Sequence, residues 1–205
     1  MSVQISAELA GHKFRRAEYV PCEHPWLVEM GRIIIPSLLV AISAHVVVPL
    51  GLTPVPFTLQ TFAVILIGLT MGSRRSFAAL LLYVAEGAAG LPVFSPHGGG
   101  GLVQLLGPTG GYLMALPVAA FVAGYATEQW HPKEQRLSRM MDILFGAISA
   151  EIVIFAGGAL WLAKLTRLPA PNIFDLAVFP FLPGEIVKLV GACTLALRWK
   201  QFSKN

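Results

Sequence analysis

The chain has 205 residues, of which 55% are hydrophobic and only 13% are charged, and its mean hydropathy is +0.68. Soluble domains carry about 25% charged residues, so this chain has too few polar side chains to cover a surface that faces water. The formal net charge is +4, but the basic residues stand at the ends of apolar segments rather than in one patch. A disordered chain, a soluble enzyme and a nucleic-acid-binding protein are therefore excluded, and the composition predicts an integral membrane protein.

Six apolar segments follow one another along the chain. A membrane-spanning helix needs roughly 20 residues, and the second, third and sixth segments are short by this measure. We predict an all-α bundle of six transmembrane helices at residues 33–50, 57–71, 76–91, 109–126, 143–163 and 183–197. In domain terms, we expect a polar cytoplasmic segment over residues 1–30, a single membrane domain over 31–200 and a short cytoplasmic tail over 201–205.

The basic residues between these segments predict the orientation of the bundle. With both termini in the cytoplasm, twelve of the fourteen Lys and Arg residues outside the segments lie on the inner side. Two uncharged loops, residues 51–56 and 92–108, then lie together on the outer side. Both are rich in Gly and Pro, which suits either ordinary connections or a lid built from backbone. The length of the second loop, without charges to solvate it, favours a folded cap.

Ionisable side chains inside the apolar segments are costly to bury, so each is a candidate functional group. Glu185 and Lys188 are three residues apart on one face of the last segment, near its outer end. Together they can present an acceptor and a donor to a small polar ligand; alternatively, they form an ion pair that holds helices together. For Glu86 and Glu151 we favour side chains that are hydrogen-bonded across helices. His97, followed by four glycines in the outer loop, is a weaker candidate for ligand contact.

Motifs for enzymatic chemistry are absent from the sequence. It contains no Gly-x-x-x-x-Gly-Lys-Ser/Thr motif for nucleotide binding, no His-Glu-x-x-His and no Gly-x-Ser-x-Gly. We therefore expect no catalytic residues and no metal site, and any energy source must be a partner or a gradient. On the first segment, Ser37 and Ala41 are small residues at a four-residue spacing. Such a stripe lets another helix approach closely, either from a partner or from this chain.

Four motifs occur in an order that resembles the BioY family, the biotin-binding S components of energy-coupling-factor (ECF) transporters. They are TPVPFTLQT (residues 53–61), GLPVF (90–94), GPTGGY (107–112) and PGEIVK (183–188), and the similarity spans about residues 31–197. The family's last motif usually reads Pro-Gly-Asp-x-x-Lys, so Glu185 keeps the charge on a side chain that is one methylene longer. Glu86 also departs from the family, since an apolar residue is expected there.

The resemblance implies a six-helix S component in the cell membrane that captures biotin from outside. It implies docking on a transmembrane coupling subunit and two cytoplasmic ATPases, with Ser37 and Ala41 at the docking surface, and no cofactor besides the substrate biotin. Glu185 would accept hydrogen bonds from the ureido N–H groups, and Lys188 would pair with the carbonyl or the carboxylate tail. The predicted biotin-binding residues are Glu185, Lys188, Tyr112, Phe94, Gln60, Thr109, Gly110, Glu86 and His97.

Two other functions stay open at this point. The longer acid at position 185 would suit an S component for a different vitamin. A polytopic membrane enzyme that uses Glu151 or Glu86 as a base belongs to another class. The fate of the ligand separates the classes, because a transporter component returns its ligand unchanged and an enzyme does not.

Overall fold

The computed structural model describes residues 25–48, 50–51, 53–128 and 136–202. Contacts within the chain group residues 31–205 into one unit and residues 1–30 into another, and most of the predicted polar segment lies outside the described residues. The elements in chain order are α2 (Pro25–Ala44), β1 (Val47–Val48), β2 (Phe57–Thr58), α3 (Gln60–Met71), α4 (Ser73–Ala88), α5 (Gly101–Leu106), α6 (Gly110–Glu128), α7 (Arg136–Thr166), α8 (Ala170–Ala177) and α9 (Leu182–Phe202).

The helical architecture expected from the sequence is confirmed, since α2, α3, α4, α6, α7 and α9 each overlap one predicted segment. By length and composition, three described helices can cross a membrane by themselves, namely Trp26–Ala44, Gly110–Glu128 and Leu137–Thr166. The pair α8 and α9, bent by 52° at the break between them, can supply a fourth crossing. The count of six spans therefore remains a prediction.

The first two predicted segments are joined by a hairpin, so their predicted ends were wrong. α2 ends at Ala44, short of the predicted residue 50, and β1 pairs antiparallel with β2. A run of β-branched valines directly before a proline disfavours the helical conformation, which explains the early end. α3 begins only at Gln60 and has 12 residues, or about 18 Å of helix, which is shorter than the roughly 30 Å hydrocarbon core of a bilayer.

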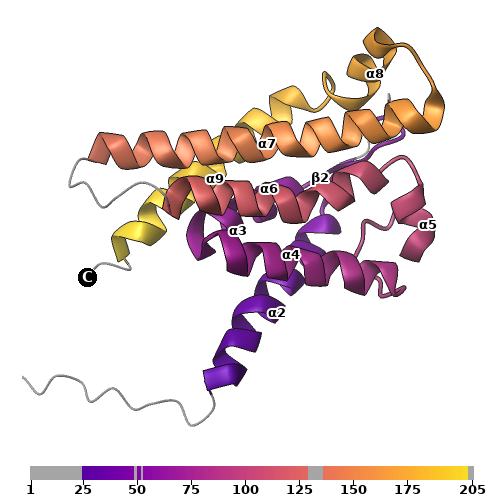
Figure 1. Cartoon of the computed structure of the whole chain (residues 1–205). Coiled ribbons are helices and arrows are strands. Elements are labelled where there is room, and N and C mark those ends of the chain that lie inside the picture. The colour runs from indigo at the N-terminus through magenta and orange to yellow at the C-terminus, as the bar shows by residue number, and fades with distance from the viewer. Residues whose placement is uncertain (1–24, 49, 52, 129–135, 203–205) are drawn as a thin grey trace, which may run out of the picture. The chain divides into compact units, whose positions relative to one another are not determined.

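Helix α6 is central to the bundle and packs against α3, α4 and α7 (Figure 1). The contact surfaces are made of small residues. Ala119, Ala120 and Ala123 of α6 are fully buried, and a β-carbon added at Gly68 of α3 would overlap with Ala120 and Ala123. Because lipid tails are as apolar as the side chains, helices in a membrane associate through this kind of close packing.

The small residues of α2 are buried inside this chain. Ser37 has 0% and Ala41 8% of its surface exposed, and the Ser37 hydroxyl donates a hydrogen bond to Glu86 of α4 at 2.7 Å. Large apolar side chains face outward instead, for example Ile35 (69% exposed) and Ile42 (68%). Ser37 and Ala41 are thus not exposed to a partner helix, and their burial agrees with the alternative, packing within the chain.

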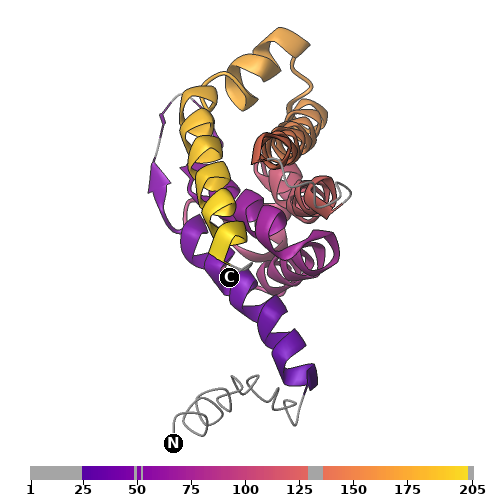
Figure 2. The ribbon, with the colours of Figure 1, turned by 90° about the vertical axis from the view of Figure 1, so that its left-hand side faces the viewer.

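The connections predicted for the outer side gather at one end of the bundle, with α5 and α8 (Figure 1). We call this end, which carries residues 53–58, 91–109 and 167–181, the loop end. Side chains tie its segments together: Thr53 Oγ1 donates to the Leu176 carbonyl at 2.7 Å, and Trp161 Nε1 donates to the Gly107 carbonyl at 2.9 Å. From α8, α9 runs back along the bundle beside α3 (Figure 2). The sequence predicted neither α5 nor α8, although a folded cap was expected over the region of α5.

Candidate ligand-binding cavity

A cavity lies beneath the loop end, between its loops and helices α3, α6, α7 and α9. Nine of its seventeen lining residues are aromatic or aliphatic and eight have polar side chains, a combination that suits a small molecule with both apolar and polar parts. The lining residues are Val55, Pro56, Phe57, Thr58, Gln60, Thr61, Ser95, Gln104, Thr109, Tyr112, Leu113, Leu116, Glu151, Ile154, Phe155, Phe181 and Glu185.

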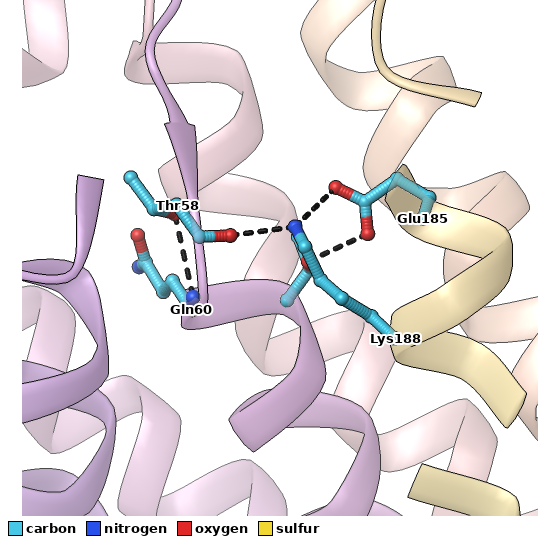
Figure 3. Close-up of polar contacts among 5 residues, drawn as sticks. Thr58, Gln60, Glu185 and Lys188 are labelled. Carbon is cyan, nitrogen blue, oxygen red and sulfur yellow. Dashed lines mark hydrogen bonds and ion pairs between the residues drawn. The ribbon is translucent and has the colours of Figure 1, made fainter. Parts of the chain in front are cut away.

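At one corner of the cavity, Glu185 and Lys188 of α9 meet Thr58 and Thr61 of the β2–α3 segment; we call this cluster the Glu185 corner. Lys188 Nζ donates to Glu185 Oε1 at 2.6 Å, to the Thr58 carbonyl at 2.5 Å and to Thr61 Oγ1 at 3.0 Å (Figure 3). Thr61 Oγ1 in turn donates to Glu185 Oε2 at 2.7 Å. An ammonium has three N–H donors, so the contacts within the corner use all of them.

The start of α9 positions this corner. Glu185 lies in the first turn of the helix, where the unpaired N–H groups and the helix dipole stabilise a negative charge. A β-carbon at Gly184 would overlap with the Phe57 ring, so glycine at this position lets the ring pack over the corner. The Phe57 centroid lies 3.7 Å from Lys188 Nζ, and the ring stacks on Phe181 at 6.4 Å. The ion pair is therefore covered by aromatic rings, which strengthens its electrostatic interaction by excluding water.

A second set of hydrogen bonds fixes Gln60 on the wall. Gln60 Nε2 donates to the Tyr83 hydroxyl at 3.2 Å, and this hydroxyl donates to the Val93 carbonyl at 3.1 Å. The Tyr83 ring is fully buried and packs edge-on against Phe94, with 5.5 Å between centroids. Phe94 therefore supports the wall from behind and does not line the cavity.

The loop between α4 and α6 folds around the side chain of Gln104. Gln104 Nε2 donates to the Ser95 carbonyl at 3.3 Å, and the amide of Gly100 donates to Gln104 Oε1 at 3.3 Å. The hydroxyl of Thr109 donates to the Gln104 carbonyl at 3.4 Å. These bonds bring Ser95, Gln104 and Thr109 to the cavity from a loop without charged residues.

The side of the cavity that faces α7 differs from the Glu185 corner. We call Glu151, Ile154 and Phe155 the Glu151 wall. Only 9% of the Glu151 surface is exposed. Neither carboxyl oxygen of Glu151 receives a hydrogen bond from a donor among the described residues, and the hydroxyl of Ser95 also has no partner there. The contact of Glu151 across helices, which we favoured from the sequence, is made with another acid, the carboxyl of Glu185 on α9.

Of the predicted biotin-binding residues, Gln60, Thr109, Tyr112 and Glu185 line the cavity, and Lys188 lies directly behind Glu185. The Tyr112 hydroxyl donates to the Ala177 carbonyl at 2.7 Å, which joins α6 to α8. The contacts of these residues with biotin remain predictions.

The other predicted residues do not reach the cavity lining. Glu86 accepts the hydrogen bond from Ser37, as the structural alternative predicted for it. His97 is exposed in a turn, and Gly110 is buried at the start of α6 against the backbone of Leu105. Phe94 packs against the Tyr83 ring and so lies behind the cavity wall.

Sequence reasoning missed several residues of the cavity. Thr61 stands in a motif that we quoted, and its three-residue spacing from Thr58 was the available indication that both reach one site. Ser95 and Gln104 gave no such indication, because a polar residue in a Gly-rich loop is usually solvated. Glu151 was noticed as an intramembrane acid, but nothing in the sequence indicated that it would face a cavity without a partner.

Comparisons with known proteins indicate the family and the fold. The model of the BioY family matches residues 17–205. The chain is 39% identical to a probable biotin transporter BioY from Pyrococcus horikoshii, over 78% of this chain and 88% of the relative. It is 36% identical to a biotin transporter BioY from Thermotoga maritima, over 80% and 91%. The fold is shared with the crystal structure of the S component for biotin from an ECF-type ABC transporter, with a TM-score of 0.71, 22% identity and coverage of 88% of this chain and 94% of that one.

Proposed function

The chain belongs to the BioY family, and on that premise we propose that it is a membrane-embedded component for biotin uptake that binds biotin in the cavity beneath the loop end. The observation that carries the proposal is the Glu185 corner, a buried carboxylate fixed by Lys188 and Thr61 at the edge of the cavity. Relatives that are named as transporters support a transport role rather than an enzymatic one.

Biotin matches this cavity in chemical terms. It has two ureido N–H donors, a ureido carbonyl, an apolar ring with a thioether sulfur and a carboxylate tail. Glu185 faces the cavity, and each carboxylate oxygen has a second lone pair available for an N–H group of the ligand. Lys188 neutralises the charge of Glu185 from behind, so the corner presents an acceptor without a net charge. Tyr112, Leu113 and Ile154 supply apolar surface for the ring.

Helix α8 is joined to its neighbouring segments by two side-chain hydrogen bonds. Thr53 and Tyr112 donate to the carbonyls of Leu176 and Ala177, two successive residues at the end of this helix. Each such bond contributes roughly 1 kcal/mol to stability, so the loop end can open locally while the bundle stays folded. We propose that biotin enters from this side and that these two bonds close again over the ligand.

The proposed partners are a transmembrane coupling subunit and two cytoplasmic ATPases. The sequence lacks a nucleotide-binding motif of the P-loop type, so energy from ATP has to reach this chain through other subunits. Ser37 and Ala41 are buried, and the docking surface is therefore assigned to the outward apolar residues of the bundle rather than to that stripe. Co-expression with such a module and purification through a tag on one ATPase tests this part of the proposal.

For the membrane arrangement we propose a multi-pass protein of the cell membrane, with six spans and both termini in the cytoplasm. The distribution of basic residues supports this orientation. A cysteine placed at Gly99 should react with an impermeant thiol reagent added from outside, and one placed at Arg136 should not. The reverse pattern would invert the orientation and move the cavity to the cytoplasmic side.

Calorimetry on the purified chain tests the ligand directly. Biotin should bind, and desthiobiotin, which keeps the cyclic urea but lacks the thioether ring, should bind more weakly. Lipoate keeps a sulfur ring and the same carboxylate tail but has no ureido group. It should bind at least about 100-fold more weakly, because the buried acceptors would then be left without donors. Tight binding of another vitamin without binding of biotin would favour the alternative S component that Glu185 leaves open.

A further inference from the structure

Three buried oxygen atoms on the cavity surface have no hydrogen-bond partner among the described residues. They are both carboxyl oxygens of Glu151 and the hydroxyl oxygen of Ser95, and both residues line the cavity. A buried polar group without a partner destabilises the folded state, and a charged group does so more strongly. Native proteins contain few such groups. A ligand that supplies the missing partner explains why these atoms share one cavity.

The Glu185 corner is different, because the chain already satisfies it. The three donors of Lys188 are all used within the corner, and each oxygen of Glu185 accepts one hydrogen bond. A ligand can bind Lys188 only by displacing one of these contacts, while Glu185 has second lone pairs to offer. The carboxyl oxygens of Glu151 receive no hydrogen bond from a donor among the described residues.

A purely structural role does not account for Glu151. Its carboxyl interacts electrostatically with both Glu185 and Lys188, and its polar contact across helices is with the carboxyl of Glu185. However, Lys188 is already neutralised by Glu185 at 2.6 Å, so the ion pair needs no second carboxyl. Two carboxyl groups that share one buried site repel each other when both are ionised, so the second acid does not strengthen the ion pair. Ligand binding gives Glu151 a role that the ion pair itself does not.

We propose that Glu151 is a ligand-binding residue whose carboxyl accepts a hydrogen bond from an N–H group of the bound molecule, with the Ser95 hydroxyl as a further polar contact. This inference rests on the proposed function and deepens it. In biotin the N–H groups are those of the ureido ring, and the site then has one carboxyl from α9 and one from α7 for the two N–H groups. Such a pair recognises a cyclic urea and rejects ring systems that lack N–H donors.

The test compares the wild-type chain with Glu151→Leu, Glu151→Gln and Glu128→Gln. The last is a matched control, since Glu128 caps α4 through Ser73 and does not line the cavity. Biotin affinity is measured by calorimetry and stability by thermal unfolding without ligand.

Glu151→Leu should lower the affinity about 10- to 100-fold, as expected for the loss of a charged hydrogen bond. It should also raise the unfolding midpoint, because it removes the unpaired acid. Glu151→Gln keeps one acceptor oxygen and should lose less affinity, and Glu128→Gln should bind as the wild type does.

Two analogues of biotin, each methylated on one ureido nitrogen, assign the contact to an N–H group. One of them should bind the wild type weakly and lose no further affinity on Glu151→Leu, because both changes remove the same hydrogen bond. Three results would overturn the inference even if the wild type binds biotin. The first is wild-type affinity in Glu151→Leu, and the second is a loss of affinity together with a lower unfolding midpoint. The third is an additive loss of affinity for both analogues. If the wild type does not bind biotin, the proposed function fails and the inference fails with it.

Discussion

The Glu185 corner and the Glu151 wall each place a carboxyl group at the same cavity, but the two carboxyl groups differ in their hydrogen bonding. At the corner, a lysine and a threonine occupy both oxygens of the glutamate at 2.6 and 2.7 Å. At the wall, both oxygens of Glu151 lack a partner among the described residues. Both side chains are more than 90% buried, so burial by itself does not separate a fixed acid from one left free for a ligand.

The difference originates in the elements that build the two regions. Three segments meet at the corner, because β2 and α3 bring Thr58 and Thr61 against the first turn of α9. The wall belongs to α7, a continuous helix of 31 residues, and the neighbours of Glu151 along it on the cavity are apolar. The corner is therefore preorganised before the ligand binds, whereas the hydrogen bonds of the wall form only with the ligand. The following changes test this distinction, in order of decreasing effect.

Removal of the ammonium should have the largest effect, because it makes the corner resemble the wall. In Lys188→Met, Glu185 and the Thr58 carbonyl lose their shared partner in a covered site, a loss on the order of 3–5 kcal/mol. We expect no measurable biotin binding by calorimetry and a lower unfolding midpoint. Lys164→Met is the control, since Lys164 is exposed and its Nζ lies 5.9 Å from the Trp161 ring. Unchanged affinity in Lys188→Met would mean that the ion pair only braces α9.

A shorter acid should weaken the corner by an intermediate amount. Glu185→Asp restores the residue that is usual in the family, but both oxygens of Glu185 are held at hydrogen-bond distance by Lys188 and Thr61. Withdrawing the carboxylate by one methylene lengthens both bonds. The expected loss is about 1–2 kcal/mol, or roughly 5- to 30-fold in biotin affinity. Glu185→Gln, which keeps the length and removes the charge, should lose more. Tighter binding by Glu185→Asp would show instead that the longer acid is a compromise.

Thr61 joins the two charged groups, and its hydroxyl should contribute less than either of them. Thr61→Val keeps the shape and removes both the bond to Glu185 and the one from Lys188. We expect biotin to bind about fivefold more weakly, which corresponds to roughly 1 kcal/mol for a hydrogen bond that water or ligand can partly replace. Thr61→Ser retains the hydroxyl and should stay close to the wild type. An equal loss in both variants would assign the effect to packing of the methyl group.

The sequence predicted the helical fold and the pairing of Glu185 with Lys188, because both depend on local patterns. Apolar runs mark the helices, and a three-residue spacing is enough to place Glu185 and Lys188 on one face of α9. The same reasoning could not predict α8, a helix of eight residues, or the hairpin of β1 and β2. These elements are too short for a periodic pattern and depend on contacts with distant segments.

Pairing between helices was the part of the site that the sequence did not reveal. Glu86 and Glu151 are both single acids in apolar segments, and one pattern describes both. In the structure Glu86 meets Ser37, 49 positions away, while Glu151 faces a cavity. The packing of the helices decides which neighbour each acid contacts. This packing depends on small residues such as those of α6, and the sequence of one segment does not show which helix it packs against. The exposed stripe at Ser37 and Ala41 was wrong for the same reason, because small residues suit a partner helix and packing within the chain equally well.

The smallest expected effect extends the comparison to Glu86, an acid that has a partner but does not line the cavity. Ser37→Ala removes the hydroxyl that donates to Glu86 at 2.7 Å, and so leaves this acid in a state like that of Glu151. Because Glu86 is only partly buried, we expect a loss of about 1 kcal/mol in stability and no change in biotin affinity. Ser43→Ala on the same helix is the matched control, since among the described residues the Ser43 hydroxyl bonds to the Val40 carbonyl of its own helix and to no acid. It should destabilise the chain less, because no acid loses a partner. If Ser37→Ala lowers the biotin affinity and Ser43→Ala does not, Glu86 contributes to ligand binding after all.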